Sequence, residues 1–330
     1  MSNIIKNRSE ILFLYDVTYA NPNGDPMEEN KPRIDEETGI NIVTDVRLKR
    51  TMRDYFLTLI ESGDIRFKEQ DVFIKEIVKE DGTQKTREER IEELKIKNKE
   101  DEKKLLEKYI DLRLFGATIA LKGKARDEKG RSITWTGPVQ FRFGRSLHRV
   151  VIDTLPGTTV MPSKEEVTRG TFIETHVVPY SLICFYGIIN ENAARTTGLT
   201  ENDVGLLIEG MWNGTKNLIT RSKAGQMPRF LMRVVYKEKN FHIGDLDKMI
   251  KLRTTMDEEK VRDISEVKID ISELVSILRK YKDKIEKVEF KSDDRTVFLI
   301  NEEEVSSTEL KERFKEGTGL NNNQIIELKI

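Results

Sequence analysis

The sequence predicts an α+β fold in which a ferredoxin-like βαββαβ sheet carries large insertions and a small C-terminal α/β extension. Apolar runs typical of strands and two capped amphipathic helices follow one another as strand, helix, strand, strand, helix, strand. With 37% hydrophobic and 35% charged residues, 14 Phe and 8 Tyr, the 330-residue chain is polar but still globular. Its length allows a large core and more than one domain.

The first predicted strand occupies residues 10–20, EILFLYDVTYA, where a nearly continuous apolar run starts at Ile11. Such a run is typical of a strand covered on both faces. The loop NPNGDP follows at residues 21–26, and its two prolines and Gly24 exclude both helix and ladder pairing. A buried strand that leads through this loop into a basic helix can hold a polyanion at a rigid edge.

The basic helix is predicted to begin at Asp45, with Thr44 as its cap, and to end at Gly63. Its buried stripe consists of apolar side chains at helical spacing, namely Leu48, Met52, Tyr55 and Leu59. Four cations are expected to lie away from this stripe or on its flank, namely Arg47, Lys49, Arg50 and Arg53. A charge run on an exposed helix face is usually only solvated, so the helix alone does not establish a binding site.

A finger-like insertion is predicted at residues 65–110, between two parts of one domain at residues 1–64 and 111–240. Thr86 and Glu89 form a capping-box pattern that opens a charged helix within it. The acidic and basic side chains of this segment balance. That balance favours a solvated projection over a binding site.

The segment WTGPVQFRFG at residues 135–144 alternates as a half-buried strand does. One face of this strand is expected to carry Val139, Phe141 and Phe143, and the other Gln140 and Arg142. Further good phosphate partners follow it, namely Arg145, Ser146, His148 and Arg149. The polar face and these side chains together are a candidate polyanion contact.

A long β-hairpin is predicted near residues 155–179, with Val160, Met161 and Phe172 as candidates for exposed apolar side chains. A second helix opens with the capping-box pair Thr200 and Asp203. The basic loop after that helix contains Arg221, Ser222 and Lys223. The last part of the chain, residues 241–330, is predicted to form the α/β extension.

The net charge of −1 is unevenly distributed along the chain. Residues 121–150 contain eight Lys or Arg and two acidic side chains, whereas residues 257–330 contain 19 acidic and 14 basic ones, a net of −5. A basic centre with an acidic end is typical of a protein with one polyanion-binding face. The single cysteine, Cys184, has apolar neighbours and is expected to be inert. No membrane span or signal peptide is recognisable, so we expect a cytoplasmic protein.

Several long motifs resemble one known family. RSEILFLYDVTYANPNGDP and NKPRIDEETGINIVTDVRLKRTMRDY resemble the backbone subunit of type I-B CRISPR surveillance (Cascade) complexes, the seventh Cas family, in the repeat-associated RNA-binding superfamily. The resemblance continues through DLRLFGATIA, TGPVQFRFGRSLHRV, YGIINENAARTTGLT and WNGTKNLITRSKAGQMPRFL, to about Tyr236. The acidic C-terminal part adds nothing specific to it.

The resemblance implies a non-catalytic filament protein of antiviral defence. Its expected partners are a CRISPR RNA, further copies of itself stacked head to tail, other Cascade subunits, and target DNA that pairs with the guide. Each copy would hold the RNA backbone with an RNA-recognition-motif-type palm, and a thumb hairpin would interrupt the guide–target duplex. No cofactor or metal is expected. The implied wedge residues are Val160, Met161 and Phe172.

The implied RNA-binding residues come from the loop, the basic helix, the 140–149 segment and the second basic loop. They are Asn23, Gly24, Asp25, Arg47, Lys49, Arg50, Arg53, Gln140, Arg142, Arg145, Ser146, His148, Arg149, Arg221, Ser222 and Lys223.

A metal-dependent ribonuclease of the same superfamily is the alternative, because Asp16, Asp25 and Asp45 lie near the strand–loop–helix edge. Against it, these carboxylates lack tight ligand spacing, and a turn and a helix N-terminus give Asp25 and Asp45 simpler roles. The three histidines, His148, His176 and His242, are dispersed. A small-molecule enzyme is a third possibility, but GxGxxG, P-loop and nucleophile-elbow motifs are missing. We therefore expect no enzymatic activity.

Overall fold

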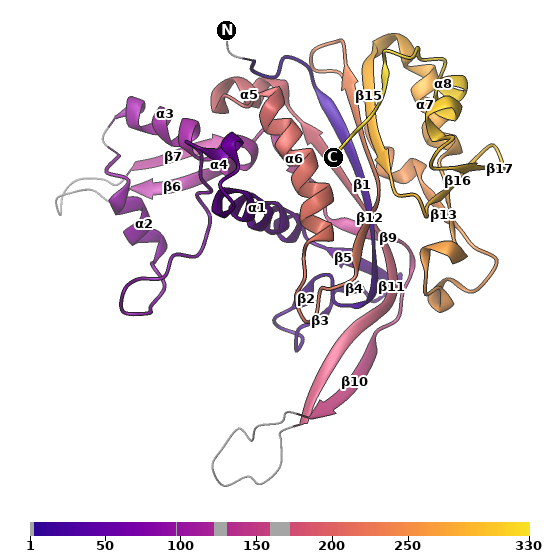
Figure 1. The fold of residues 1–330 in the computed structure, drawn as a ribbon, viewed down its shortest axis with the longest axis horizontal. Coiled ribbons are helices and arrows are strands. Elements are labelled where there is room, and N and C mark those ends of the chain that lie inside the picture. The colour runs from indigo at the N-terminus through magenta and orange to yellow at the C-terminus, as the bar shows by residue number, and fades with distance from the viewer. Residues whose placement is uncertain (1–2, 97, 122–130, 159–171) are drawn as a thin grey trace.

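The computed structural model describes residues 3–96, 98–121, 131–158 and 172–330, and it shows a mixed α+β protein (Figure 1). The predicted α+β class is confirmed. In the described residues the largest sheet runs in the order β18-β15-β12-β1-β11-β9-β5-β4, with β10 and β8 also paired to β11. These strands are β18 (Ile325–Glu327), β15 (Ile285–Ser292), β12 (Gln226–Tyr236), β1 (Ser9–Ala20), β11 (Phe172–Ile189), β9 (Gly144–Arg149), β5 (Ile40–Val43), β4 (Ile34–Asp35), β10 (Asp153–Thr158) and β8 (Val139–Phe141).

Strand β1 lies at the centre of this sheet and pairs antiparallel with β11 on one side and β12 on the other. Its residues are buried from Ser9 to Val17, as the apolar run predicts. Because side chains alternate along a strand, Phe13 packs toward one layer and Leu12 toward the other. Strand β1 therefore supports two separate hydrophobic layers.

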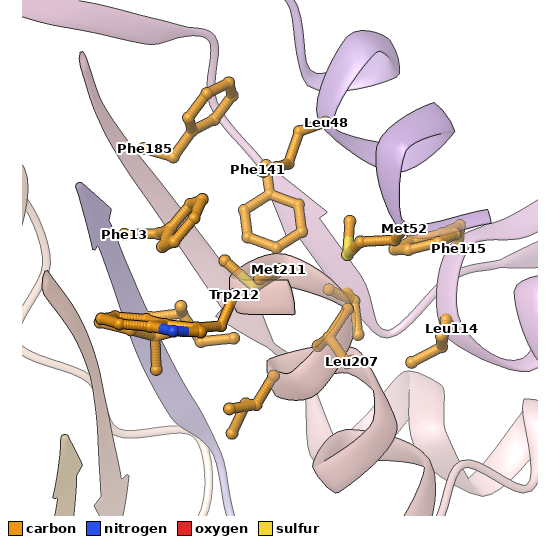
Figure 2. Packing of buried hydrophobic residues seen from close by; sticks show 14 of the residues in the cluster. Phe13, Leu48, Met52, Leu114, Phe115, Phe141, Phe185, Leu207, Met211 and Trp212 are labelled. Atoms are coloured by element: carbon orange, nitrogen blue, oxygen red, sulfur yellow. The ribbon is translucent and has the colours of Figure 1, made fainter. Parts of the chain in front are cut away.

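The first layer consists of α1 (Asp45–Glu61), α6 (Glu201–Lys216) and the short α5 (Glu191–Thr197). Figure 2 shows Met52 of α1 and Met211 of α6 directed toward Phe13 and Phe185 of the sheet. Gly210 allows the two helices to approach, because a Cβ atom there would lie 3.0 Å from the Phe56 ring. This layer fixes α1 over the central strands.

The two helices begin differently. Helix α6 has the predicted capping box, in which the Thr200 hydroxyl accepts from the Asp203 N–H and the Asp203 carboxylate accepts from the Thr200 N–H. Thr44 does not cap α1 with its side chain. Its hydroxyl and backbone N–H instead donate to the Asn23 Oδ1, each at 2.8 Å. The NPNGDP loop therefore holds the start of the basic helix.

The second layer is the C-terminal part of the chain. It contains η2 (Leu246–Met249), β13 (Lys251–Arg253), β14 (Lys268–Asp270), α7 (Ser272–Lys280), β16 (Val297–Ile300), β17 (Glu303–Ser306) and α8 (Leu310–Thr318). The Glu10 carboxylate of β1 ties this part to the sheet. It accepts hydrogen bonds from the Ile243 and Gly244 N–H groups, both at 2.8 Å, and from the Tyr186 and Tyr236 hydroxyls.

The insertion forms a lobe with its own small core. Its elements are η1 (Ile65–Phe67), α2 (Arg87–Glu93), α3 (Lys99–Lys108), α4 (Ile110–Phe115) and the hairpin of β6 (Gly116–Leu121) and β7 (Arg131–Thr136). The core includes Ile119, Ile133 and Trp135, which lie beyond the predicted boundary at residue 110. The lobe therefore also uses residues that the sequence assigns to the palm.

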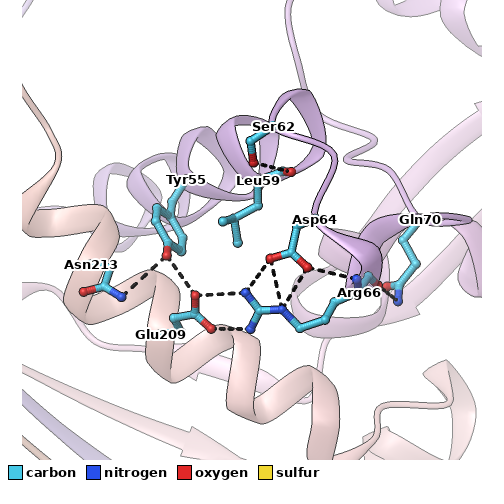
Figure 3. A network of polar contacts seen from close by, with 8 residues as sticks. All are labelled: Tyr55, Leu59, Ser62, Asp64, Arg66, Gln70, Glu209 and Asn213. Atoms are coloured by element: carbon cyan, nitrogen blue, oxygen red, sulfur yellow. Dashed lines mark hydrogen bonds and ion pairs between the residues drawn. The ribbon is translucent and has the colours of Figure 1, made fainter. Parts of the chain in front are cut away.

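Charged pairs join this lobe to the helical layer. The fully buried Asp111 carboxylate accepts from the Arg53 Nε at 2.8 Å and from the Phe73 and Ile74 N–H groups at 2.7 and 3.1 Å. Figure 3 shows a second junction, where Arg66 bridges Asp64 and Glu209. These contacts fix the lobe against α1 and α6.

The predicted hairpin is formed by β10 and β11, which pair antiparallel from Asp153↔Val177 to Thr158↔Phe172. Figure 1 shows that it extends away from the rest of the molecule. Phe172 is the first residue of β11, whereas Val160 and Met161 lie outside the described residues. A short ladder of β2 (Gly24–Asp25) and β3 (Lys31–Pro32) orders the NPNGDP loop.

The prediction for Phe143 is wrong. The alternation of the 135–144 segment continues only to Phe141, where β8 ends, and Phe143 is 57% exposed. After Phe141 the chain leaves the pairing of β8 with β11, and it enters β9 at Gly144. Among the described residues, none of the helices is long and apolar enough to span a membrane.

Asp111→Asn should lower the free energy of unfolding by about 3 kcal/mol or more, because the Arg53 guanidinium would remain buried without its counter-charge. Urea denaturation followed by circular dichroism measures the loss. Asp54→Asn is the matched control, since it removes the more exposed pair with Arg50 and should cost less than about 1 kcal/mol. Equal losses in the two variants would contradict this view of the junction.

Candidate nucleic-acid interface

The cations predicted to bind a polyanion fall into two groups, those with a carboxylate partner and those without. Six of them have one, in the pairs Lys49–Asp45 (2.8 Å), Arg50–Asp54 (2.6 Å), Arg53–Asp111 (2.8 Å), Arg142–Asp245 (2.6 Å), Arg145–Asp35 (3.5 Å) and Arg149–Glu258 (3.7 Å). Among the described residues, Arg47, Arg221 and Lys223 have no carboxylate oxygen within 4 Å. These three are the cations with positive charge left for an external anion.

Helix α1 does not present its cations on one exposed face. Lys49 and Arg53 are buried, and their charged groups lie 5.5 and 5.2 Å from the centre of the Phe115 ring. The sequence predicts Arg53 on the exposed side, and this expectation is wrong because α4 packs over that side of the helix and supplies Asp111. Arg50 remains exposed, but Asp54 and Glu76 share its charge.

Ser146 and His148 are buried within the sheet. The Ser146 hydroxyl donates to the His148 carbonyl at 2.6 Å and accepts from the Asn41 N–H at 2.9 Å. The His148 Nε2 accepts from the Leu182 N–H at 3.2 Å, and burial lowers the pKa of the ring. These contacts make both residues part of the internal polar structure of the sheet.

The three loop residues Asn23, Gly24 and Asp25 shape the NPNGDP loop. Asn23 holds the start of α1, and the Asp25 carboxylate accepts from Arg33 at 2.6 Å and from the Met27 N–H at 3.0 Å. Gly24 has no room for a side chain, because a Cβ atom there would lie 1.9 Å from the Asn30 Oδ1. The loop therefore has a fixed shape beside the helix N-terminus.

The strand segment with Gln140 and Arg142 lies against the acidic C-terminal part. Gln140 is exposed and its amide donates to the Gly137 carbonyl at 2.9 Å. The Arg142 guanidinium lies 4.7 Å from the centre of the Tyr186 ring and pairs with Asp245. Carboxylates from residues 245–259 thus neutralise Arg142 and Arg149.

Lys223 and Arg47 form the remaining centre of positive charge among the predicted cations. We call these two side chains, together with the backbone of Asn21, the anion site. The Lys223 ammonium donates to the Asn21 carbonyl at 2.8 Å. The Arg47 Nη2 donates to the Thr51 hydroxyl at 3.1 Å, and its buried Nε has no hydrogen-bond partner. Burial, and secondly the charge of Arg47, lower the pKa of Lys223 to about 8. Burial also lowers the pKa of Arg47.

Three segments far apart in the sequence build this site. The Asn21 N–H donates to the Ser222 carbonyl at 2.7 Å, which joins the end of β1 to the second basic loop. Arg47 comes from the first turn of α1, whose start Asn23 holds. Two like charges held near each other and partly removed from water favour an anion between or beside them. Arg221, whose guanidinium donates to the Thr175 hydroxyl at 3.3 Å, lies in the same loop and is exposed.

The sequence did not single out two further residues of this region. Asn21 and Gln226 are 2% and 4% exposed, and the Asn21 Oδ1 and the Gln226 Nε2 have no hydrogen-bond partner. Gln226 lies opposite Val17 of β1. The only signal for Asn21 was its position in the NPNGDP loop, and none marked Gln226, because unsatisfied polar groups depend on tertiary contacts.

The three aspartates of the ribonuclease alternative have partners within the protein. Asp16 is buried against Arg229 at 2.8 Å, while Asp25 pairs with Arg33 and Asp45 with Lys49. In the part of the chain that the structure describes, no group of three or more His, Cys, Asp or Glu is arranged to hold a metal ion. Cys184 is buried, and burial raises the pKa of its thiol. The geometry therefore does not favour the alternative.

Comparisons with known proteins identify similar chains. A family model described as "CRISPR-associated protein Cas7" matches residues 7–272. The CRISPR-associated protein Cas7 of Haloferax volcanii is 33% identical over 327 residues, which cover 92% of each chain. A chain of a CRISPR RNA-guided surveillance complex is similar in structure, with a TM-score of 0.49 and 12% identity over 86% of this chain and 88% of that one. A chain of a pre-nicking CRISPR RNA-guided surveillance complex gives a TM-score of 0.48 and 12% identity over 86% and 92%.

Lys223 should titrate near pH 8 and not near its ordinary value of 10.5. The Cε chemical shift in ¹³C-lysine-labelled protein measures this, with Lys223→Arg to assign the signal. Arg47→Gln should raise the pKa, because it removes a neighbouring positive charge. Since the folded-state pKa lies below the unfolded value, stability should increase as the pH rises from about 8 to about 10.5. Titration at the ordinary lysine value would show that the site is not as enclosed as the structure indicates.

Proposed function

The chain belongs to the Cas7 family of CRISPR-associated proteins, and from this premise we propose that it binds the sugar-phosphate backbone of a CRISPR RNA. The observation that carries the proposal is the pair Arg47 and Lys223, two partly buried cations with no carboxylate partner among the described residues. Phosphate is the anion that nucleic acids offer in a regular series. A site of this kind positions a strand without reading its bases.

Sequence-independent binding fits the way the site is built. Its cations come from a helix turn and a loop that are fixed by hydrogen bonds to the backbone. With Arg47, Lys223 and the exposed Arg221, about three phosphates per copy would be neutralised. The other predicted cations are not counted, because each has a carboxylate partner.

Assembly is the second part of the proposal. We infer that copies stack head to tail along the guide of a type I-B complex, together with other Cascade subunits, in cytoplasmic antiviral defence. The guide bases would remain free to pair with target DNA. The projecting β10–β11 hairpin supports a thumb role, with Val160, Met161 and Phe172 as its proposed wedge.

The remaining architecture supports a palm with attached parts. The order β12-β1-β11-β9, with α1 and α6 on one face, supports a ferredoxin-like palm. We propose that the palm comprises residues 1–64 and the part of 111–240 outside the lobe, that the finger-like insertion extends from 65–110 into the β6–β7 hairpin, and that the extension is 241–330. We also propose that the protein is not an enzyme, because each candidate aspartate has a structural ion-pair partner.

Arg47→Ala and Lys223→Ala should each weaken binding to guide-length RNA by roughly tenfold, whatever the base sequence, because each removes one charged contact to phosphate. Fluorescence anisotropy with several labelled RNAs measures the affinities. In the parent protein the slope of log K against log salt should be about −2, from roughly −0.7 for each phosphate on a single strand.

Arg142→Ala is the matched control for these variants. It removes an equally cationic side chain, but one that Asp245 and Asp247 already neutralise, so the affinity should change less than about threefold. Two results would contradict the proposal. One is an equal loss in Arg142→Ala, and the other is a preference for particular bases together with a salt slope near zero.

A further inference from the structure

The insertion lobe contains a cleft between α2, β6 and residues 73–77, called here the lobe cleft. Figure 1 shows α2 and β6 as neighbouring elements of the lobe. The cleft has a volume of about 540 Å³, a size typical of sites that hold a ligand or several side chains. The described residues that line it include none from the anion site. Its apolar lining includes Phe73, Ile74, Ile77, Ala117 and Ile119.

The lobe cleft follows one edge of β6. Four successive residues of this strand, from Gly116 to Ile119, line the cleft. Because the side chains of a strand alternate between its two faces, four residues in succession line one cavity only where that cavity runs along the strand edge. Strand β6 pairs with β7 on its other edge, and it has no second strand partner in the part of the chain that the structure describes. An unpaired edge of this kind can pair with another extended chain.

Arg90 of α2 brings a positive charge into the cleft, and among the described residues this charge has no carboxylate oxygen within 4 Å. The backbone N–H of Arg90 donates to the Thr86 carbonyl at 3.0 Å, one helical turn earlier. Its guanidinium lies 5.8 and 5.7 Å from the centres of the Phe73 and Tyr109 rings. The Nε and Nη2 atoms are covered and have no hydrogen-bond partner, so Nη1 is the nitrogen that a ligand in the cleft can reach.

Each of the other cations that line the cleft has a carboxylate partner. The pairs are Arg50 with Asp54 and Glu76, Lys75 with Asp71, and Lys85 with Glu93. One accessible charge beside apolar side chains matches one carboxylate next to an apolar group, whereas a nucleic acid offers a regular series of phosphates. The strand edge adds donors and acceptors for a peptide backbone. The lobe cleft therefore has the chemistry of a peptide-binding site.

We propose that the lobe cleft is a docking site for an extended acidic segment of a partner protein, which adds to the edge of β6 as a further strand. A carboxylate of this segment accepts a hydrogen bond from the Arg90 Nη1. An apolar side chain next to it packs against Ile74 and Ile77. Because Ile74 is 50% exposed in the free protein, this contact removes apolar surface from water. The docking site is separate from the anion site and binds its partner without RNA.

Selection of displayed random heptapeptides on the RNA-free protein supplies the probes. The selected peptides should contain an acidic residue close to an aliphatic or aromatic one. Fluorescence anisotropy of the labelled synthetic peptides measures their affinities. Arg90→Gln should weaken their binding about tenfold or more, because it removes a charge-assisted hydrogen bond. Replacing the acidic residue of the peptide by its amide should cause the same loss on the parent protein, which tests the contact even if Arg90→Gln does not fold.

Lys85→Gln is the matched control, because Lys85 lines the same cleft but already pairs with Glu93. It should change the peptide affinities less than about threefold. Methylation of the peptide backbone nitrogens, one at a time, tests the pairing with β6. It should abolish binding at every second position, since alternate N–H groups of a strand face the same neighbour.

Four results would overturn this inference. They are a selection that does not enrich acidic peptides, an unchanged affinity in folded Arg90→Gln, binding that survives methylation at every backbone nitrogen, and displacement of the peptides by guide-length RNA. The last result would show that the lobe cleft is a nucleic-acid surface. Each of them leaves RNA binding at the anion site untouched, because the two sites share no residue.

Discussion

Arg47 and Lys223 hold positive charge in partly buried positions, and no carboxylate oxygen of the described residues lies within 4 Å of either. A partly buried charge without a counter-ion destabilises the folded state unless an anion binds to it. Contacts with the surrounding structure hold both cations in place. The Asn21 backbone joins the end of β1 to the basic loop, and Asn23 fixes the turn of α1 that carries Arg47. The strand, the two loops and the helix thus form one anion site, on which the proposed RNA binding depends.

The predicted cations that have carboxylate partners serve to hold parts of the protein together. Asp111 neutralises Arg53 and thereby fixes the insertion lobe to α1. Asp245 and Glu258, from the acidic C-terminal part, neutralise Arg142, which follows β8, and Arg149, which ends β9. The C-terminal part is itself held to the central strand by Glu10. Its negative charge therefore neutralises two of the cations that the sequence predicted to bind RNA.

Local patterns in the sequence predicted the parts of the fold that local physics determines. The apolar run gave β1, and the Thr200–Asp203 pair gave the start of α6. Which cations are free could not be predicted, because their partners are distant in sequence: Asp111 is 58 residues from Arg53 and Asp245 is 103 residues from Arg142. The exposure of Phe143 and the unsatisfied Asn21 oxygen likewise depend on tertiary contacts.

Proton uptake on RNA binding tests directly whether phosphate lies against Lys223. If phosphate lies against Lys223, binding raises its pKa from about 8, so at pH 8.5 the protein should take up most of one proton per copy. Calorimetry in buffers of different ionisation enthalpy measures this number. We expect this uptake to disappear in Lys223→Arg while binding persists. RNA binding by the parent protein without proton uptake at pH 8.5 would contradict it.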